Sequence, residues 1–229
     1  MSVILALDTS TEACSAAIIT DNAEFSEYEV CPREHNQKLL AMVEKVLADA
    51  QLTLDDVDAI AYGSGPGSFT GVRITTGIVQ GLAYGAQLPV IGVGSLAAMA
   101  HGVFRRTGAN HIISAIDARM AEIYLGAYHI TELGKVNPLM DEVVTQPHDS
   151  INHLPKDNWT SIGTGWQTYK TELLAQQAVN QDSVEFFPHA LDIALIGKQQ
   201  WAEGDFTSAE LTTPTYLRNE VTWKKMPGK

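Results

Sequence analysis

The sequence is poor in the residues that most often build metal sites and hydrolytic centres. It has two cysteines, Cys14 and Cys31, which form no Cys-x-x-Cys pair, and this fits a protein of the reducing cytosol. Its seven histidines are scattered, with no His-x-x-x-His or His-Glu-x-x-His spacing. His35 and His101 are interpreted as surface or satisfied histidines. There is also no Gly-x-Ser-x-Gly elbow, so no hydrolytic triad can be assembled from the spacing. Because the histidines and cysteines form no cluster, we predict no metal site.

Long hydrophobic runs and excess positive charge are missing as well. The N-terminus has no basic region, and its apolar run stops at Asp8, too short for a signal peptide or a membrane span. The formal net charge at pH 7 is −12, which repels the phosphates of nucleic acids. We therefore expect no membrane association and no independent binding to RNA. Any work on RNA would need a basic partner.

The length suits one large domain or two small ones. At 229 residues with 45% hydrophobic residues, the chain has the composition of a folded globular protein. A polar, turn-like stretch at 105–110 is the best candidate boundary. It predicts an N-terminal unit, 1–105, and a C-terminal unit, 106–229, whose tail is expected to return to the first unit.

A glycine-rich bend is the most unusual local feature. It follows a strand-like run, 58–62, and leads into a helix-like run, 72–86. A strand, a bend and a helix in this order suit the binding of an anion or the close approach of another backbone. It is no Walker A loop, because no Gly-Lys-Ser/Thr ends it. Arg73 lies near the N-terminus of this helix, where the helix dipole disfavours a positive charge. A nearby anion or carboxylate would offset this cost. The candidate residues of the bend are Gly65, Gly67, Ser68, Thr70 and Gly71.

A second candidate feature is an Asp-led turn near the N-terminus. Asp8, Thr9 and Ser10 follow a buried strand-like run, 3–7, and precede a returning strand, 14–20. In a phosphate site such a carboxylate would hold Mg²⁺ or water, because it cannot face phosphate directly. The plainer interpretation is an Asx turn that satisfies its own backbone.

The second half repeats this pattern. An apolar run, 111–119, ends in Asp117 and Arg119, and a returning strand, 122–129, follows. The echo suggests two similar halves that face a cleft, with these two residues on its second side.

Hydrophobic periodicity predicts the remaining elements. The expected order is a third strand at 25–30, an amphipathic helix at 36–50, a strand at 89–93, a helix at 95–104 capped by Ser95, a strand at 159–162, a helix at 166–178 and a last helix that ends near 203.

Three glycines form a row within the helix-like run after the bend. Gly77, Gly81 and Gly85 stand four residues apart and share one face. Each costs roughly 0.8–1 kcal/mol of helix stability relative to alanine, so close packing on this face would offset the loss. The packing partner is either the protein's own sheet or a helix of another chain, and both interpretations are open. With Arg73, the row is the candidate partner interface.

Taken together, these motifs resemble the bacterial TsaB (YeaZ) family over nearly the whole chain. The string Gly-Pro-Gly-Ser-Phe-Thr-Gly-x-Arg is the most specific of them. The resemblance implies an α/β fold of the actin/hexokinase/Hsp70-like (ASKHA) type, with two lobes of which the second is reduced. The motifs that carry it are 8–11, 65–73, 117–119 and 216–218.

The resemblance also implies a function and a set of partners. In that family the protein is a non-catalytic subunit that pairs with TsaD, the related catalytic subunit, for threonylcarbamoyl transfer to the adenosine next to the anticodon of tRNA. A TsaE-like ATPase joins them, and the subunit forms a homodimer when alone. We accordingly expect a cytoplasmic protein that meets tRNA only through the complex and has no cofactor of its own, ATP and a metal being used by partner proteins.

One departure from TsaD supports this assignment. The resemblance implies that TsaD-like chains carry two metal-binding histidines, four residues apart, where this chain has Ser95 and Met99. Neither side chain replaces imidazole as a ligand for a transition metal in that geometry. The alternatives are an ATP-dependent small-molecule kinase of the same fold and, less favoured, a peptidase. A kinase would turn over ATP alone, and a peptidase needs a nucleophile–base pair or a metal cluster.

Overall fold

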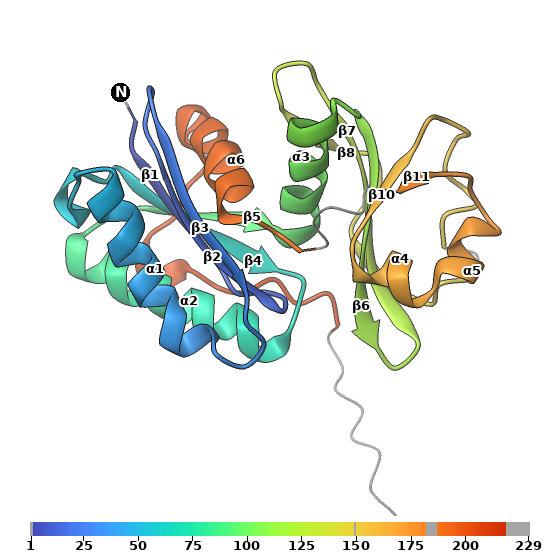
Figure 1. Ribbon diagram of the computed structural model, residues 1–229, viewed down its shortest axis with the longest axis horizontal. Coiled ribbons are helices and arrows are strands. Elements are labelled where there is room, and N and C mark those ends of the chain that lie inside the picture. The colour runs from blue at the N-terminus through green and yellow to red at the C-terminus, as the bar shows by residue number, and fades with distance from the viewer. Residues whose placement is uncertain (1, 149, 182–186, 219–229) are drawn as a thin grey trace, which may run out of the picture.

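The computed structural model describes residues 2–148, 150–181 and 187–218, which form two mixed β-sheets with helices on both faces (Figure 1). The strands are β1 Ile4–Asp8, β2 Ala13–Ile19, β3 Glu24–Val30, β4 Ala59–Gly65, β5 Val90–Gly94, β6 His111–Arg119, β7 Glu122–Ile130, β8 Val136–Pro138, β9 Val143–Thr145, β10 Thr160–Ile162 and β11 Asn180–Gln181. The α-helices are α1 His35–Asp49, α2 Phe69–Ala86, α3 Ser95–Thr107, α4 Thr164–Thr168, α5 Lys170–Leu174 and α6 Ala190–Glu203. Two short 3-10 helices span Leu54–Asp56 and Ala209–Leu211.

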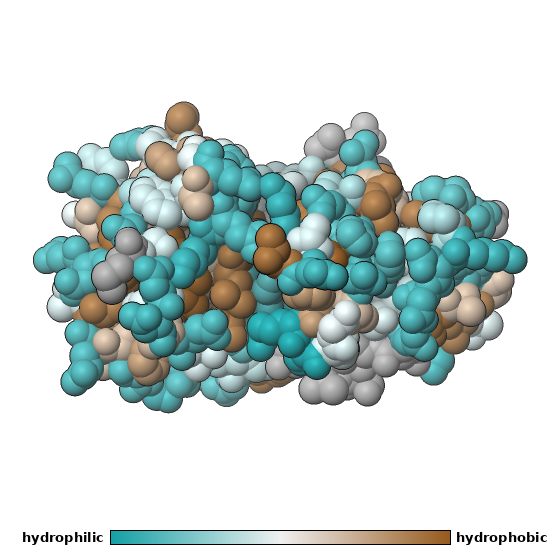
Figure 2. All heavy atoms as spheres, turned by 90° about the horizontal axis from the view of Figure 1, so that it is seen from above, coloured by the Kyte–Doolittle hydropathy of each residue, from teal (hydrophilic) through white to brown (hydrophobic). Residues whose placement is uncertain are grey.

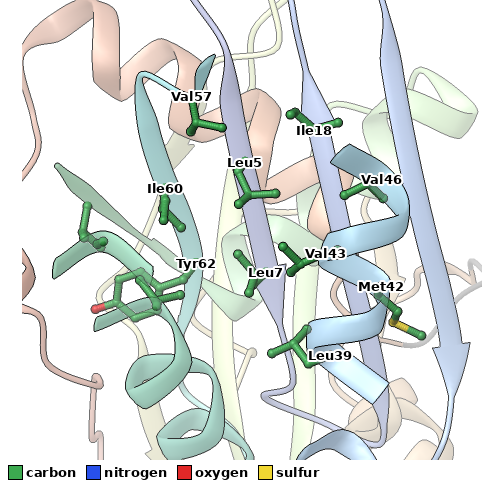
Figure 3. Close-up of a cluster of buried hydrophobic side chains, with 14 of the residues drawn as sticks. Leu5, Leu7, Ile18, Leu39, Met42, Val43, Val46, Val57, Ile60 and Tyr62 are labelled. Atoms are coloured by element: carbon green, nitrogen blue, oxygen red, sulfur yellow. The ribbon is translucent and has the colours of Figure 1, made fainter. Parts of the chain in front are cut away.

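The first lobe is built on the sheet β3-β2-β1-β4-β5. Successive side chains of its central strand, β1, point to opposite faces. Leu5 and Leu7 join the core beneath α1 and α2, where Figure 3 shows them beside Leu39 of α1. Ile4 and Ala6 join the core beneath α6. Because both faces are covered, β1 is apolar at nearly every position, as its sequence indicated.

The second lobe repeats the plan on a smaller scale. Its sheet has the order β11-β10-β6-β7-β8, and β9 pairs with β7. Ile112 and Ile116 face α3, whereas Ile113 and Ala115 face the side of α4 and α5. β6 pairs antiparallel with β7 as β1 does with β2, which confirms the predicted echo. The outer strands β8 to β11 have only two or three residues each, so the predicted two-lobed α/β fold with a reduced second lobe is confirmed.

Two expected helix features are wrong. Ser95 does not cap α3, because Gly94 is the N-cap residue and the Ser95 hydroxyl donates instead to Ser10 Oγ at 3.0 Å. The expected helix at 166–178 is two short helices, α4 and α5, which end at Leu174. They are separated by one residue with a non-helical backbone, which periodicity alone did not reveal.

Helices α3 and α6 lie between the two sheets (Figure 1). α3 packs on the second sheet, although the expected boundary assigns most of it to the first unit. α6 packs on the first sheet, where a Cβ at Gly197 would lie 2.8 Å from the Ala61 side chain. At its N-terminal end the backbone N–H of Ala190 donates to Ser15 Oγ at 2.9 Å. The packing therefore crosses the boundary, and the division into 1–105 and 106–229 stays a prediction.

The surface seen from above is mostly hydrophilic, broken by small hydrophobic groups (Figure 2). Within the described residues, no helix is long and apolar enough to cross a membrane.

Candidate functional site

The glycine-rich bend packs directly on the first Asp turn. The backbone N–H of Ser68 donates to the Ser10 carbonyl at 2.7 Å. A Cβ at Gly67 would lie 2.1 Å from that carbonyl oxygen, and a Cβ at Gly71 would lie 2.0 Å from the Thr9 carbonyl oxygen. Of the two roles suggested for the bend, its glycines serve the close approach of another backbone.

The hydroxyls of the site are bound to the protein itself. Thr9 Oγ1 donates to the Gly71 carbonyl at 2.8 Å and lies 2.6 Å from the hydroxyl of Thr75. Ser68 is the N-cap of α2, and its side chain accepts from the Gly71 N–H at 3.3 Å. Thr70 lies exposed in the first turn of α2. The Ser and Thr residues that suggested a phosphate site therefore mostly hold the bend against the turn.

Asp8 is the most perturbed group of the site. Its carboxylate is fully buried, and Oδ2 accepts from both the N–H and the hydroxyl of Ser10 at 3.2 Å. Oδ1 has no hydrogen-bond partner among the described residues and fills the space in which Gly63 lacks a side chain. Burial raises the pKa of Asp8 to about 7, against the opposing effect of the Ser10 hydrogen bonds. At neutral pH this carboxyl is therefore partly protonated, which makes it a poor fixed anionic ligand.

The second Asp turn closes mainly on itself. Asp117 accepts from the backbone N–H of Arg119 and pairs with its guanidinium, both at 2.9 Å. The same guanidinium reaches Glu12 of the first lobe at 3.4 Å. The two turns thus approach one another through Arg119, and no hydrogen bond among the described residues joins Asp8 to Asp117.

The C-terminal tail covers the bend. The sequence analysis expected the tail to return to the first unit, but no pattern indicated that it would contact the bend. Gly65 has a φ of 109°, and a Cβ there would lie 2.7 Å from the Thr215 carbonyl oxygen. The Thr215 N–H donates to the Ser64 carbonyl at 2.7 Å. Upstream, the hydroxyl of Tyr62 donates to the Thr213 carbonyl at 2.9 Å. No local pattern near residue 215 signals this contact, because its partner is about 150 residues away.

The guanidinium of Arg73 contacts aromatic rings. Its guanidinium lies 3.3 Å from the centre of the Phe69 ring, and its Nε donates to the hydroxyl of Tyr216 at 2.9 Å. Among the described residues no carboxylate pairs with it. The sequence analysis considered an anion or a carboxylate as the partner of Arg73. In the structure its partners are the Phe69 ring, through a cation–π contact within α2, and the hydroxyl of Tyr216 in the tail.

The glycine row is open. A Cβ at Gly77, Gly81 or Gly85 would meet no described atom within 4 Å. The interpretation that these glycines seat α2 on its own sheet is therefore wrong for the described part of the chain. Beside the row lies a hollow of about 310 Å³ lined by Gln80, Gly81, Tyr84, Ala209 and Glu210.

The positions of the TsaD-like metal ligands are part of the core. Ser95 is fully buried against Ser10, and Met99 packs in the core between α3 and the second sheet. Among the described residues no group of three or more His, Cys, Asp or Glu side chains could hold a metal ion. The absence of a bound metal stays a prediction.

A further buried polar cluster joins α3 to α6. Asp192 Oδ1 lies 2.8 Å from His101 Nδ1 and accepts from Arg105 Nε at 2.9 Å. Burial acts to raise the pKa of Asp192, but the hydrogen bonds from His101 and Arg105 outweigh it and hold the pKa below its usual value. His101 is thus a satisfied histidine, as interpreted. His35 is also buried, and its Nε2 has no partner among the described residues.

Comparisons with known proteins agree with this architecture. A family model described as "TsaD: tRNA N6-adenosine threonylcarbamoyltransferase" matches residues 20–204. The chain is 45% identical to the "tRNA threonylcarbamoyladenosine biosynthesis protein TsaB" of Escherichia coli, covering 99% of both chains. It is 40% identical to the protein of the same name in Haemophilus influenzae, covering 99% of this chain and 98% of that one.

Solved structures give the same result. The structure "YeaZ from Pseudomonas aeruginosa" superimposes with a TM-score of 0.89 at 43% identity and covers 95% of this chain and 100% of that one. A second structure, of a protein described as similar to "peptidase YEAZ" from the same organism, gives a TM-score of 0.88 at 44% identity, with the same coverage. The full-length relatives and the solved structures agree, and the chain belongs to the TsaB (YeaZ) family.

Proposed function

We propose that this protein is a non-catalytic subunit that pairs with a TsaD-like catalytic subunit and supports threonylcarbamoyl transfer to the adenosine next to the anticodon of tRNA. The observation that carries the proposal is a contrast between two surfaces of one helix. At the start of α2 the glycine-rich bend is covered by the chain itself, and further along α2 the glycine row is left open.

The closed end argues against catalysis by this chain. The bend, the Asp8 turn and Thr215 pack against one another at the place where the sequence suggested an anion site. A kinase of this fold would need that region open and Asp8 ionised, whereas burial holds its pKa near 7. A peptidase is disfavoured because the described part of the chain shows no nucleophile–base pair and because Ser95 and Met99 offer no metal ligands.

The open end argues for a protein partner. Gly77, Gly81 and Gly85 present bare backbone on which another helix axis can come close. Tyr84 is 70% exposed and Leu211 71% exposed beside this row, so apolar surface flanks it. Large exposed apolar groups beside a flat surface are typical of interfaces. We assign the face from Gly77 to Gly85 to the TsaD-like subunit, and to a second copy of this chain when the protein is alone. Arg73, one turn before this face, is held by Phe69 and Tyr216, and we leave it out of the interface.

The remaining assignments follow from this role. A TsaE-like ATPase joins the assembly, and ATP and metal are used by the partner proteins, so this chain has no cofactor of its own. The charge of −12 is consistent with a subunit that meets tRNA only through the complex. The protein acts in the cytoplasm.

The test is reconstitution with and without this chain. The chain should co-purify with the TsaD-like protein, and tRNA modification should require both. Gly81→Leu should abolish association while leaving the monomer folded, because the added side chain meets open space in the monomer and steric overlap in the complex. Ala202→Leu is the matched control, since it adds an apolar group at an exposed position on α6, on the other face of the first sheet. Modification that proceeds without the chain, or ATP turnover by the chain alone, would contradict the proposal.

A further inference from the structure

An aromatic and arginine cluster lies where the tail leaves the first lobe. Phe69 is 55% exposed and Tyr216 41% exposed, and their ring centres are 6.1 Å apart. The Arg73 guanidinium is held near both, 3.3 Å from the centre of the Phe69 ring and 5.6 Å from that of Tyr216. Its two terminal nitrogens have no hydrogen bond or ion pair among the described residues. The cluster therefore presents an arginine already fixed in position with donors to spare.

The second lobe extends this cluster through the tail. Arg218 donates to the Ala118 carbonyl at 3.1 Å and pairs with Glu122, so residues 216–218 connect the first lobe to the turn between β6 and β7. Met120, at the tip of that turn, is 63% exposed, and its sulfur lies 3.8 Å from Nη1 of Arg218. We name the whole surface the tail-root patch: Phe69, Arg73, Arg119, Met120, Tyr216 and Arg218.

The turn that completes the patch has an unfavourable backbone. Arg119, Met120 and Ala121 have φ values of 63°, 58° and 59°. Turns of this kind normally use Asn and Gly, because a left-handed backbone brings the Cβ of other residues too close to the following carbonyl oxygen. Strain of this kind concentrates at functional sites. Here it presents Arg119, 74% exposed, and Met120 beside the tail.

The charge around the patch differs from that of the whole chain. Arg119 is paired with Asp117 and Glu12, and Arg218 with Glu122, so three carboxylates face these two guanidinium groups. Arg73 has no carboxylate partner among the described residues, and it brings the formal charge of the group to zero. The patch is therefore neutral in a protein whose net charge is −12.

We propose that the tail-root patch is a contact surface for the RNA substrate, in which Arg73 binds a backbone phosphate and Phe69 or Tyr216 stacks on an unpaired base. The proposal rests on the proposed function. Single-stranded RNA is recognised by exposed aromatic rings that stack bases and by arginines that bind phosphate, and the patch presents both. Exposed Phe, Tyr, Met and Arg side chains also occur at the cores of protein interfaces, so a protein occupant is an outcome that the experiment separates from RNA. One patch on an acidic chain is too little to bind RNA alone, so the contact forms only in the assembled complex.

The experiment measures tRNA binding and modification by the complete complex of this chain with its TsaD-like and TsaE-like partners. The variants are Arg73→Ala and Tyr216→Leu. Lys135→Ala is the matched control, because it removes an exposed cation beyond the opposite end of β7. Each patch variant should weaken tRNA binding roughly five- to hundredfold, the range expected for one lost stacked base. The change should appear in KM for tRNA, with kcat and complex assembly unchanged.

Salt dependence identifies the phosphate contact. For Arg73→Ala the slope of log K against log salt concentration should fall by about 0.7–1, as for one lost phosphate contact, whereas Tyr216→Leu should leave the slope unchanged. Wild-type tRNA affinity in both variants would overturn the patch assignment and leave the proposed function standing. Loss of assembly in the variants would overturn it in favour of a protein interface. A wild-type chain that neither assembles nor supports modification would overturn both proposals.

Discussion

Gly71 lies so close to Thr9 that a Cβ on the glycine would stand 2.0 Å from the threonine carbonyl oxygen. No side chain fits at that distance unless the backbone moves. The contact joins the start of α2 to the end of β1, and it explains why the bend keeps a glycine there. It also distinguishes this glycine from the three that follow in the same helix.

We expect opposite effects from alanine at two glycines of α2. Gly71→Ala should lower the free energy of unfolding by about 1–3 kcal/mol or more, because the methyl group overlaps backbone. Gly81→Ala should raise it by roughly 0.8–1 kcal/mol, because the methyl group meets open space and alanine favours the helix. Urea unfolding of the monomer at neutral pH measures both. Shifts in the same direction would contradict the two environments described.

The buried carboxyl of Asp8 should make stability depend on pH. The pKa of Asp8 in the folded state is about 7, against 3.8 when unfolded, so the folded state holds the proton more tightly. The contribution of Asp8 to the free energy of unfolding therefore falls as pH rises from about 4 to 7 and is constant above that range. At roughly 1.4 kcal/mol per pKa unit, the whole effect is on the order of 4 kcal/mol.

Asp8→Asn tests this dependence, because asparagine has a similar shape and no charge. The variant should gain stability relative to wild type as pH rises from 4.5 to 7.5, measured by urea unfolding at fixed ionic strength. Asp55→Asn, at an exposed position, is the control and should show no such trend. A stability difference that is the same at every pH would show that Asp8 titrates normally.

Removing Asp192 should weaken the packing of α3 against α6. Asp192→Ala leaves His101 and Arg105 without their shared partner, and loss of one side of a buried ion pair costs about 3–5 kcal/mol. In the wild-type protein, the low pKa of Asp192 means that its stabilising effect is complete above the unfolded pKa and is lost as pH falls through the lower folded value. Thermal unfolding at pH 7 and below pH 4 measures both effects. A variant as stable as wild type at pH 7 would contradict this role.

The isolated chain should have negligible affinity for tRNA at physiological salt. Its net charge of −12 opposes the approach of a polyanion, and the tail-root patch supplies little uncompensated charge. Fluorescence anisotropy with labelled tRNA checks this. Submicromolar binding by the chain alone would show that the tail-root patch outweighs the average charge.

The sequence alone determined the local structure and the family. Alternation and helical periodicity report which side of a segment is buried, so β1, β2, α1 and the end of α6 were predicted within a few residues. The repeated strand–Asp turn–strand pattern indicated two similar halves because the same local chemistry recurs. The glycine-rich string and its companions at 8–11 and 216–218 were specific enough to indicate the TsaB family.

Only the tertiary structure decided what those motifs contact. Glycine in the bend is compatible with a phosphate or a backbone, and the distances from Gly67 and Gly71 to the first turn showed the backbone. Arg73 donates a hydrogen bond to Tyr216, which is 143 residues away in sequence, and periodicity contains no information about such a partner. The sequence pattern of the glycine row fits two opposite environments, a covered face and an open one. The pattern shows that this face of the helix lacks side chains, but it does not show which element covers the face. In the described chain that face is open, a property of how the first sheet, α1 and the tail pack around α2.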